Sequence, residues 1–109
     1  MILDKPIRVL IVDGSINAEV ALRLRSTFRL TDTGWHKQVR PKVWSTLRPS
    51  VAEAVLQVAV KAVLEDIRKE LHERPDLTWE DKALIDSATA DRERFIRIMR
   101  QLPVLLRRD

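Results

Sequence analysis

The sequence contains no cysteine, which excludes disulfide bonds, thiolate metal sites and a cysteine nucleophile. Glycine occurs only twice and proline five times, so few residues favour tight turns and an all-β fold is disfavoured. No apolar run approaches the roughly 20 residues that a membrane-spanning helix needs. Asp4, Pro6 and Arg8 interrupt any secretory signal near the N-terminus. We therefore expect a cytoplasmic protein that does not bind a membrane.

Residue types that commonly carry catalysis are scarce as well. Tyrosine is absent, and neither of the two histidines, His36 and His72, has a cysteine, serine or carboxylate at a spacing diagnostic of a site. On a helix, the neighbours Glu65 and Asp66 point in different directions, which favours solvated carboxylates over general acid–base catalysis. We therefore expect a protein that is not an enzyme and that carries no cofactor or metal.

The residues that are present favour a globular protein. Hydrophobic residues make up 45% of the 109-residue sequence and charged residues 33%, a balance that disordered tails do not have. A chain of this length corresponds to a single domain over residues 1–109. The net charge is +4 at neutral pH, and the first half of the sequence holds the excess of basic residues. One surface of the protein is therefore expected to attract anions.

The first thirty or so residues predict a strand followed by a helix. The β-branched run Ile7–Val12 has the length of a strand, and the turn signal Asp13-Gly14 follows it. Apolar residues then recur at every fourth position, which predicts a helix from Ile16 to Leu30. A lone strand needs a partner, which is the segment Val104–Leu106, the extended segment around Val39 or a strand of another chain. The remaining alternative is that the run crosses the helices without strand pairing.

Two helical segments are predicted in the middle of the chain. The chain is expected to be extended up to Arg40 and then to form a short helix with Pro41 in its first turn. A long helix is predicted from Val51 to Leu71, because apolar residues cover most of its circumference. Ser50 with Glu53 three residues later matches a capping box at the start of this helix.

The last helix is predicted to begin after Thr78 and to end at Pro103. Short polar residues from Ser87 to Asp91 compete for backbone hydrogen bonds, so a bend or a split is expected there. Together these elements predict a mainly α fold, a compact bundle of three to four helices with one short N-terminal β-strand. That strand pairs with a C-terminal segment or with another chain.

Basic and aromatic residues are interleaved from Arg23 to Arg48, a segment with seven basic residues and one acid. Basic side chains replace counterions along a phosphate backbone, and flat side chains provide stacking surfaces for the bases of single strands. We predict a nucleic-acid-binding patch formed by Arg25, Arg29, Lys37, Arg40, Lys42, Trp44 and Arg48. Trp35 has the spacing of a core residue, whereas Trp44 fits a core or a surface position equally well. A second basic group, Arg92, Arg94, Arg97 and Arg100, is diluted by Asp91 and Glu93.

Two functions are compatible with these features. The first is a small non-enzymatic protein or subunit that binds RNA or DNA through its phosphates without clear base specificity, since no signature of a base-reading motif is present. The alternative is a helical protein–protein interaction module (an adaptor, assembly subunit or inhibitor) that oligomerises or binds an acidic protein. With either function, we expect a homo-oligomer or a subunit of a larger complex.

Overall fold

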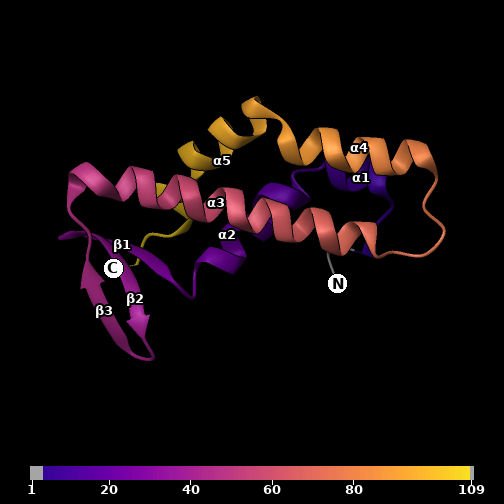
Figure 1. Cartoon of the computed structure of the whole chain (residues 1–109). Coiled ribbons are helices and arrows are strands. Elements are labelled where there is room, and N and C mark those ends of the chain that lie inside the picture. The colour runs from indigo at the N-terminus through magenta and orange to yellow at the C-terminus, as the bar shows by residue number, and fades with distance from the viewer. Residues whose placement is uncertain (1–3, 109) are drawn as a thin grey trace.

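The computed structural model describes residues 4–108, in which five helices accompany one three-stranded antiparallel sheet (Figure 1). In chain order the elements are α1 (Ile7–Val12), α2 (Ser15–Leu24), β1 (Phe28–Thr31), β2 (Gly34–Arg40), β3 (Val43–Thr46), α3 (Pro49–His72), α4 (Trp79–Ala90) and α5 (Arg92–Leu105). The fold is therefore α+β, and the prediction of a mainly α bundle with one N-terminal strand is wrong.

The predicted N-terminal strand Ile7–Val12 is the short helix α1 in the structure. Pro6 precedes it with an extended ψ of 143°, and the Pro6 carbonyl accepts two backbone hydrogen bonds, at 3.0 and 3.1 Å. Ile7 and Leu10, three positions apart, are buried, whereas Val12 is 82% exposed. Packing of one helical face against the core outweighs the β propensity of this run, a preference of only about 1 kcal/mol.

Helix α2 ends at Leu24, well before the predicted end at Leu30, and the chain then turns into β1. The hydroxyl of Ser26 donates to the carbonyl of Arg23 at 3.2 Å, a local bond of the kind that competes with helix continuation. Phe28 still joins the core at 2% exposure, but it does so from the first position of β1.

The sheet has the strand order β1-β2-β3, and Pro41 and Lys42 form the turn between β2 and β3. The prediction of a short helix beginning at Pro41 is therefore wrong. Proline fixes φ near −65° at the first turn position, and Lys42 has a φ of 62° at the second, which together match a type II turn. Proline is favoured both in the first turn of a helix and at the first central position of a type II turn, so Pro41 is compatible with either.

The C-terminal segment also takes part in strand pairing. The Leu30 N–H donates to the Leu106 carbonyl at 3.0 Å, and the Arg108 N–H donates to the Leu30 carbonyl at 2.9 Å. Pairing of this segment with Ile7–Val12, one of the alternatives that the sequence left open, does not occur, because Ile7–Val12 is helical and the C-terminal residues pair with β1.

Helix α3 confirms the long helix predicted from Val51 to Leu71, with small shifts at both ends. The predicted capping box is wrong, because Arg48 is the N-cap residue and no side chain caps this end. Pro49 occupies the first turn of α3, where its missing N–H costs no helical hydrogen bond.

The predicted split of the C-terminal helix is confirmed at Asp91, which separates α4 from α5. Thr78 caps α4 as predicted, since its hydroxyl accepts a hydrogen bond from the Asp81 N–H at 3.1 Å. Pro103 does not end the last helix but lies inside its final turn, two residues before Leu105.

Helix α3 runs along most of the length of the molecule, and α2, α4 and α5 pack against it. Its core residues recur at every third or fourth position: Ala52, Leu56, Val60, Leu64, Ile67 and Leu71. Figure 1 shows the β2–β3 hairpin projecting from the body near the start of α3. Within residues 4–108, every helix is too short or too polar to cross a bilayer. The projecting hairpin carries most of the predicted binding residues.

Candidate nucleic-acid interface

The antiparallel register divides the sheet residues between two faces, because paired residues on neighbouring strands point to the same side. Arg29 pairs with His36, and Gln38 pairs with Trp44, so these four side chains share one face, here termed the outer face. The inner face, toward the helices, carries Phe28, Leu30, Trp35 and Lys37. The basic segment is therefore split between a face that meets the core and a face that meets solvent.

Arg29 and Trp44 stack on the outer face. The guanidinium carbon of Arg29 lies 4.3 Å from the centroid of the Trp44 ring, well within cation–π distance. Both side chains are half-buried, and the Nε atom of Arg29 is buried without a hydrogen-bond partner in the described chain. The stack thus holds a positive charge in a fixed position on the sheet.

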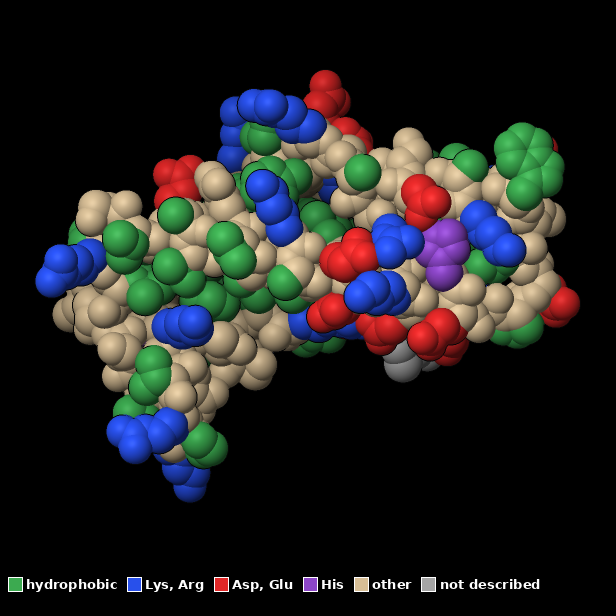
Figure 2. Space-filling model, viewed as in Figure 1, with side chains coloured by type: hydrophobic (Ala, Val, Ile, Leu, Met, Phe, Trp, Pro, Cys, Tyr) green, Lys and Arg blue, Asp and Glu red, His purple; other side chains and the backbone are tan. Residues whose placement is uncertain are grey.

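The turn between β2 and β3 forms a basic tip. Arg40 and Lys42 are exposed on either side of Pro41, and Figure 2 shows lysine and arginine side chains gathered at the end of the projecting hairpin. Behind the tip, the Gln38 amide satisfies both of its neighbours when its nitrogen faces the Ser26 carbonyl, to which it donates at 2.7 Å, and its oxygen faces the Lys42 N–H, from which it accepts at 2.9 Å. These two bonds fix the backbone that carries the basic side chains.

No carboxylate neutralises this tip within residues 4–108. The single acid between Arg23 and Arg48 is Asp32, which lies in the turn at the other end of β2. Its carboxylate accepts a hydrogen bond from the Arg107 guanidinium at 2.7 Å. The charges of Arg40 and Lys42 therefore remain available to an anion from outside.

The remaining predicted site residues lie elsewhere. Lys37 is on the inner face, at the rim of an apolar groove between the sheet and α3. Arg48 is exposed at the start of α3, at the opposite end of β3 from the tip, and Arg25 is exposed at the end of α2. The structure thus brings together four of the seven predicted residues, Arg29, Arg40, Lys42 and Trp44, which we call the hairpin patch.

His36 takes part in the outer face in a way that the sequence reasoning missed. Its Nε2 atom lies 3.0 Å from Thr31 Oγ1 and 2.9 Å from Thr33 Oγ1, and its Nδ1 atom lies 3.4 Å from Thr46 Oγ1. These hydroxyls connect the ring to both strands that flank β2. The sequence carries no clear signal for this placement, because Trp35 to Val39 runs apolar, polar, polar, polar, apolar and lacks the period of two that marks a strand.

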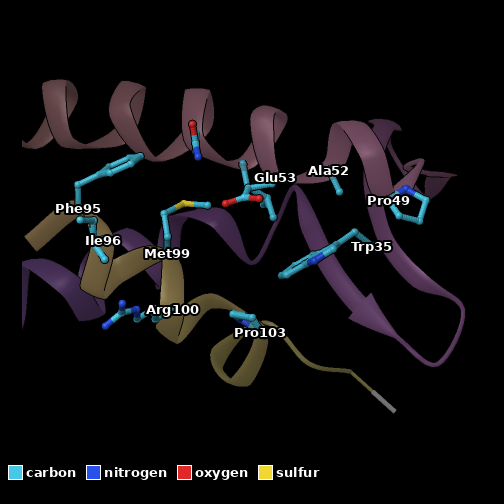
Figure 3. Close-up of a pocket in the computed structure, with 11 residues that line it drawn as sticks. Trp35, Pro49, Ala52, Glu53, Phe95, Ile96, Met99, Arg100 and Pro103 are labelled. Carbon is cyan, nitrogen blue, oxygen red and sulfur yellow. The ribbon is translucent and has the colours of Figure 1, made fainter. Parts of the chain in front are cut away.

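Trp35 occupies the inner face and lines an apolar cavity of about 490 Å³ between the sheet, α3 and α5. Figure 3 shows the Trp35 ring reaching into this space from β2, with Phe95 and Met99 entering it from α5. Trp35 also packs against the core, so it is no stacking surface on the outer face. Within residues 4–108, no group of three or more His, Asp and Glu side chains is placed to hold a metal ion.

Comparison with known proteins gives no relative from which a role could be taken. No protein family model matches the sequence, and neither the curated proteins nor the solved structures include a significant match. The assignment of function therefore depends on the geometry and charge of the chain itself.

Proposed function

We propose that this chain is a non-enzymatic nucleic-acid-binding protein that contacts the phosphate backbone through the hairpin patch. One observation carries the proposal: Arg40 and Lys42 are exposed at the tip of a projecting hairpin, and neither forms an ion pair within residues 4–108. Basic side chains in such a position release condensed counterions when they bind phosphates. The projection also lets the tip approach a nucleic acid before the helices collide with it.

Within the hairpin patch, Arg29 and Trp44 lie on the outer face of the sheet, behind the tip that carries Arg40 and Lys42. A guanidinium held over an indole presents a flat, positively charged surface that can contact a phosphate or a base. An arginine can read guanine through two hydrogen bonds, but the sequence carries no signature of a base-reading motif around this single side chain. Binding is therefore expected to depend on charge and strand geometry and to lack base specificity.

The test measures binding of fluorescent RNA and DNA strands of about 20 nucleotides, single-stranded and duplex, across a salt series that starts at about 50 mM. The double variant Arg40→Glu with Lys42→Glu is expected to weaken binding strongly. Each lost phosphate contact should also reduce the slope of log affinity against log salt by about 1.

A matched control separates the patch from the overall charge. Lys82→Glu with Arg92→Glu makes the same charge change at exposed positions of α4 and α5, away from the hairpin. We expect this control to retain most of the affinity and the salt slope of the unchanged protein. The proposal fails if no strand binds at the lowest salt, or if the control loses as much affinity as the hairpin variant.

A further inference from the structure

A groove on a different surface combines arginines with exposed aliphatic side chains. It runs between α5 and the junction of α1 with α2, and it has a volume of about 610 Å³. Three arginines, Arg94, Arg97 and Arg100, line it from α5, and no carboxylate lines it. We call this surface the arginine groove. It lies apart from the hairpin patch, on elements that the proposed function does not use.

The positive charge of the arginine groove is not neutralised within residues 4–108. Arg97 and Arg100 are exposed and form no ion pair there. Arg94 has only neutral partners, donating to Asn17 Oδ1 at 2.8 Å and to the Ile11 carbonyl at 2.7 Å. Burial lowers the pKa of Arg94, an effect that Asp91 opposes and Arg97 reinforces. The groove is therefore a site of positive potential.

The walls of the arginine groove are apolar and unusually exposed. Val12 is 82% exposed on the α1 side, while Val104 and Leu105 are 79% and 45% exposed on the α5 side. On α5, Arg97, Arg100 and Val104 follow the spacing of one helical face. A ligand that covers these side chains must itself present apolar groups next to negative charges.

We infer that the arginine groove binds an acidic amphipathic helix of a partner protein. Such a helix presents aliphatic side chains to Val12 and Val104 and carboxylates to Arg97 and Arg100, so both of its faces match the groove. A nucleic-acid backbone supplies the charge but no aliphatic surface. A lipid bilayer supplies both, but a flat surface does not enter a concave groove. This binding is a second activity, independent of the hairpin patch.

The test uses a designed fluorescent peptide with leucines along one helical face and glutamates on the others, titrated with the intact protein. The protein is expected to bind this peptide and not a peptide of the same composition in scrambled order. Arg97→Glu with Arg100→Glu should weaken binding about two- to thirtyfold, since each of the two exposed charge pairs contributes about 0.2–1 kcal/mol. Val104→Ser, a nearly fully exposed position, should weaken it without changing the charge.

The controls separate this surface from the hairpin patch. Arg40→Glu with Lys42→Glu, and Lys82→Glu with Arg92→Glu, should leave peptide binding unchanged. The inference is overturned if the designed peptide does not bind at micromolar concentration, or if the scrambled peptide binds equally well. It is also overturned if Arg97→Glu with Arg100→Glu has no more effect on peptide binding than the controls. Binding that depends on Arg97 but occurs only with anionic phosphatidylglycerol vesicles, and not with the peptide, would overturn it as well.

Discussion

The ionised carboxylate of Asp13 connects Lys5, which precedes α1, to Ser15, the first residue of α2. Its Oδ1 atom accepts a hydrogen bond from the Ser15 N–H at 2.8 Å, and its Oδ2 atom accepts one from the Lys5 ammonium at 2.9 Å. The hydrogen bonds from Ser15 and Lys5 lower the pKa of Asp13 from 3.8 to about 2. The carboxylate therefore stabilises the folded state above about pH 4, and this stabilisation is lost as the pH falls toward 2.

The corresponding prediction concerns Asp13→Ala. We expect a lower melting temperature than that of the unchanged protein at neutral pH, with the difference shrinking as the pH is lowered toward 2. Circular dichroism melts at several pH values measure it. Asp66→Ala removes an exposed carboxylate on α3 that makes no hydrogen bond within residues 4–108, and it should show no such pH-dependent difference. A difference for Asp13→Ala that is equally large at pH 2 would contradict the assignment.

At the scale of the element, the sequence predicts what depends on long or strong local signals. The long apolar pattern of α3, the Thr78 cap and the polar break before Asp91 all identify their elements correctly. Each of these signals has one structural meaning. The local structure that these signals predict is therefore the same in the folded protein.

The elements that the sequence misassigns are those whose signals have two meanings. Ile7–Val12 is short enough to form either a strand or one and a half helical turns, and burial of Ile7 and Leu10 selects the helix. Pro41 suits a first helical turn and a type II turn equally, and pairing of β2 with β3 selects the turn. The same holds for the residues of the hairpin patch. The sequence identifies them as basic or aromatic, but only the formation of the sheet determines which of them lie close together.

The β2–β3 turn provides a prediction at this scale. Lys42 has a positive φ of 62°, a conformation that is costly for residues with a Cβ atom and free of that cost for glycine. Lys42→Gly should therefore be more stable than Lys42→Ala by about 0.5–1 kcal/mol, since both remove the same charge and differ in the strain. Urea denaturation measures the difference. Equal stability of the two variants would mean that the turn is not formed as described.

At the scale of the whole molecule, α3 connects two ends that carry different features. The hairpin patch lies near its start, whereas α4 packs along its second half (Figure 1). Buried residues of α3 form one continuous hydrophobic cluster with those of α2, α4 and α5. A continuous core predicts that the two ends unfold together. The prediction of a single domain over residues 1–109 requires the same cooperative unfolding.

A remote substitution tests this cooperativity. Ile85 of α4 is fully buried, and Ile85→Val should lower the free energy of unfolding by about 0.5–1.5 kcal/mol. Trp44→Phe and Trp79→Phe leave Trp35 as the only fluorescent tryptophan, so its emission reports on the end that carries the sheet. In one cooperative unit, Ile85→Val shifts the Trp35 transition and the far-ultraviolet circular dichroism transition to lower urea by the same amount. Lys82→Ala, an exposed change on the same helix, should shift neither. A Trp35 transition that stays in place while circular dichroism shifts would show that the two ends unfold separately.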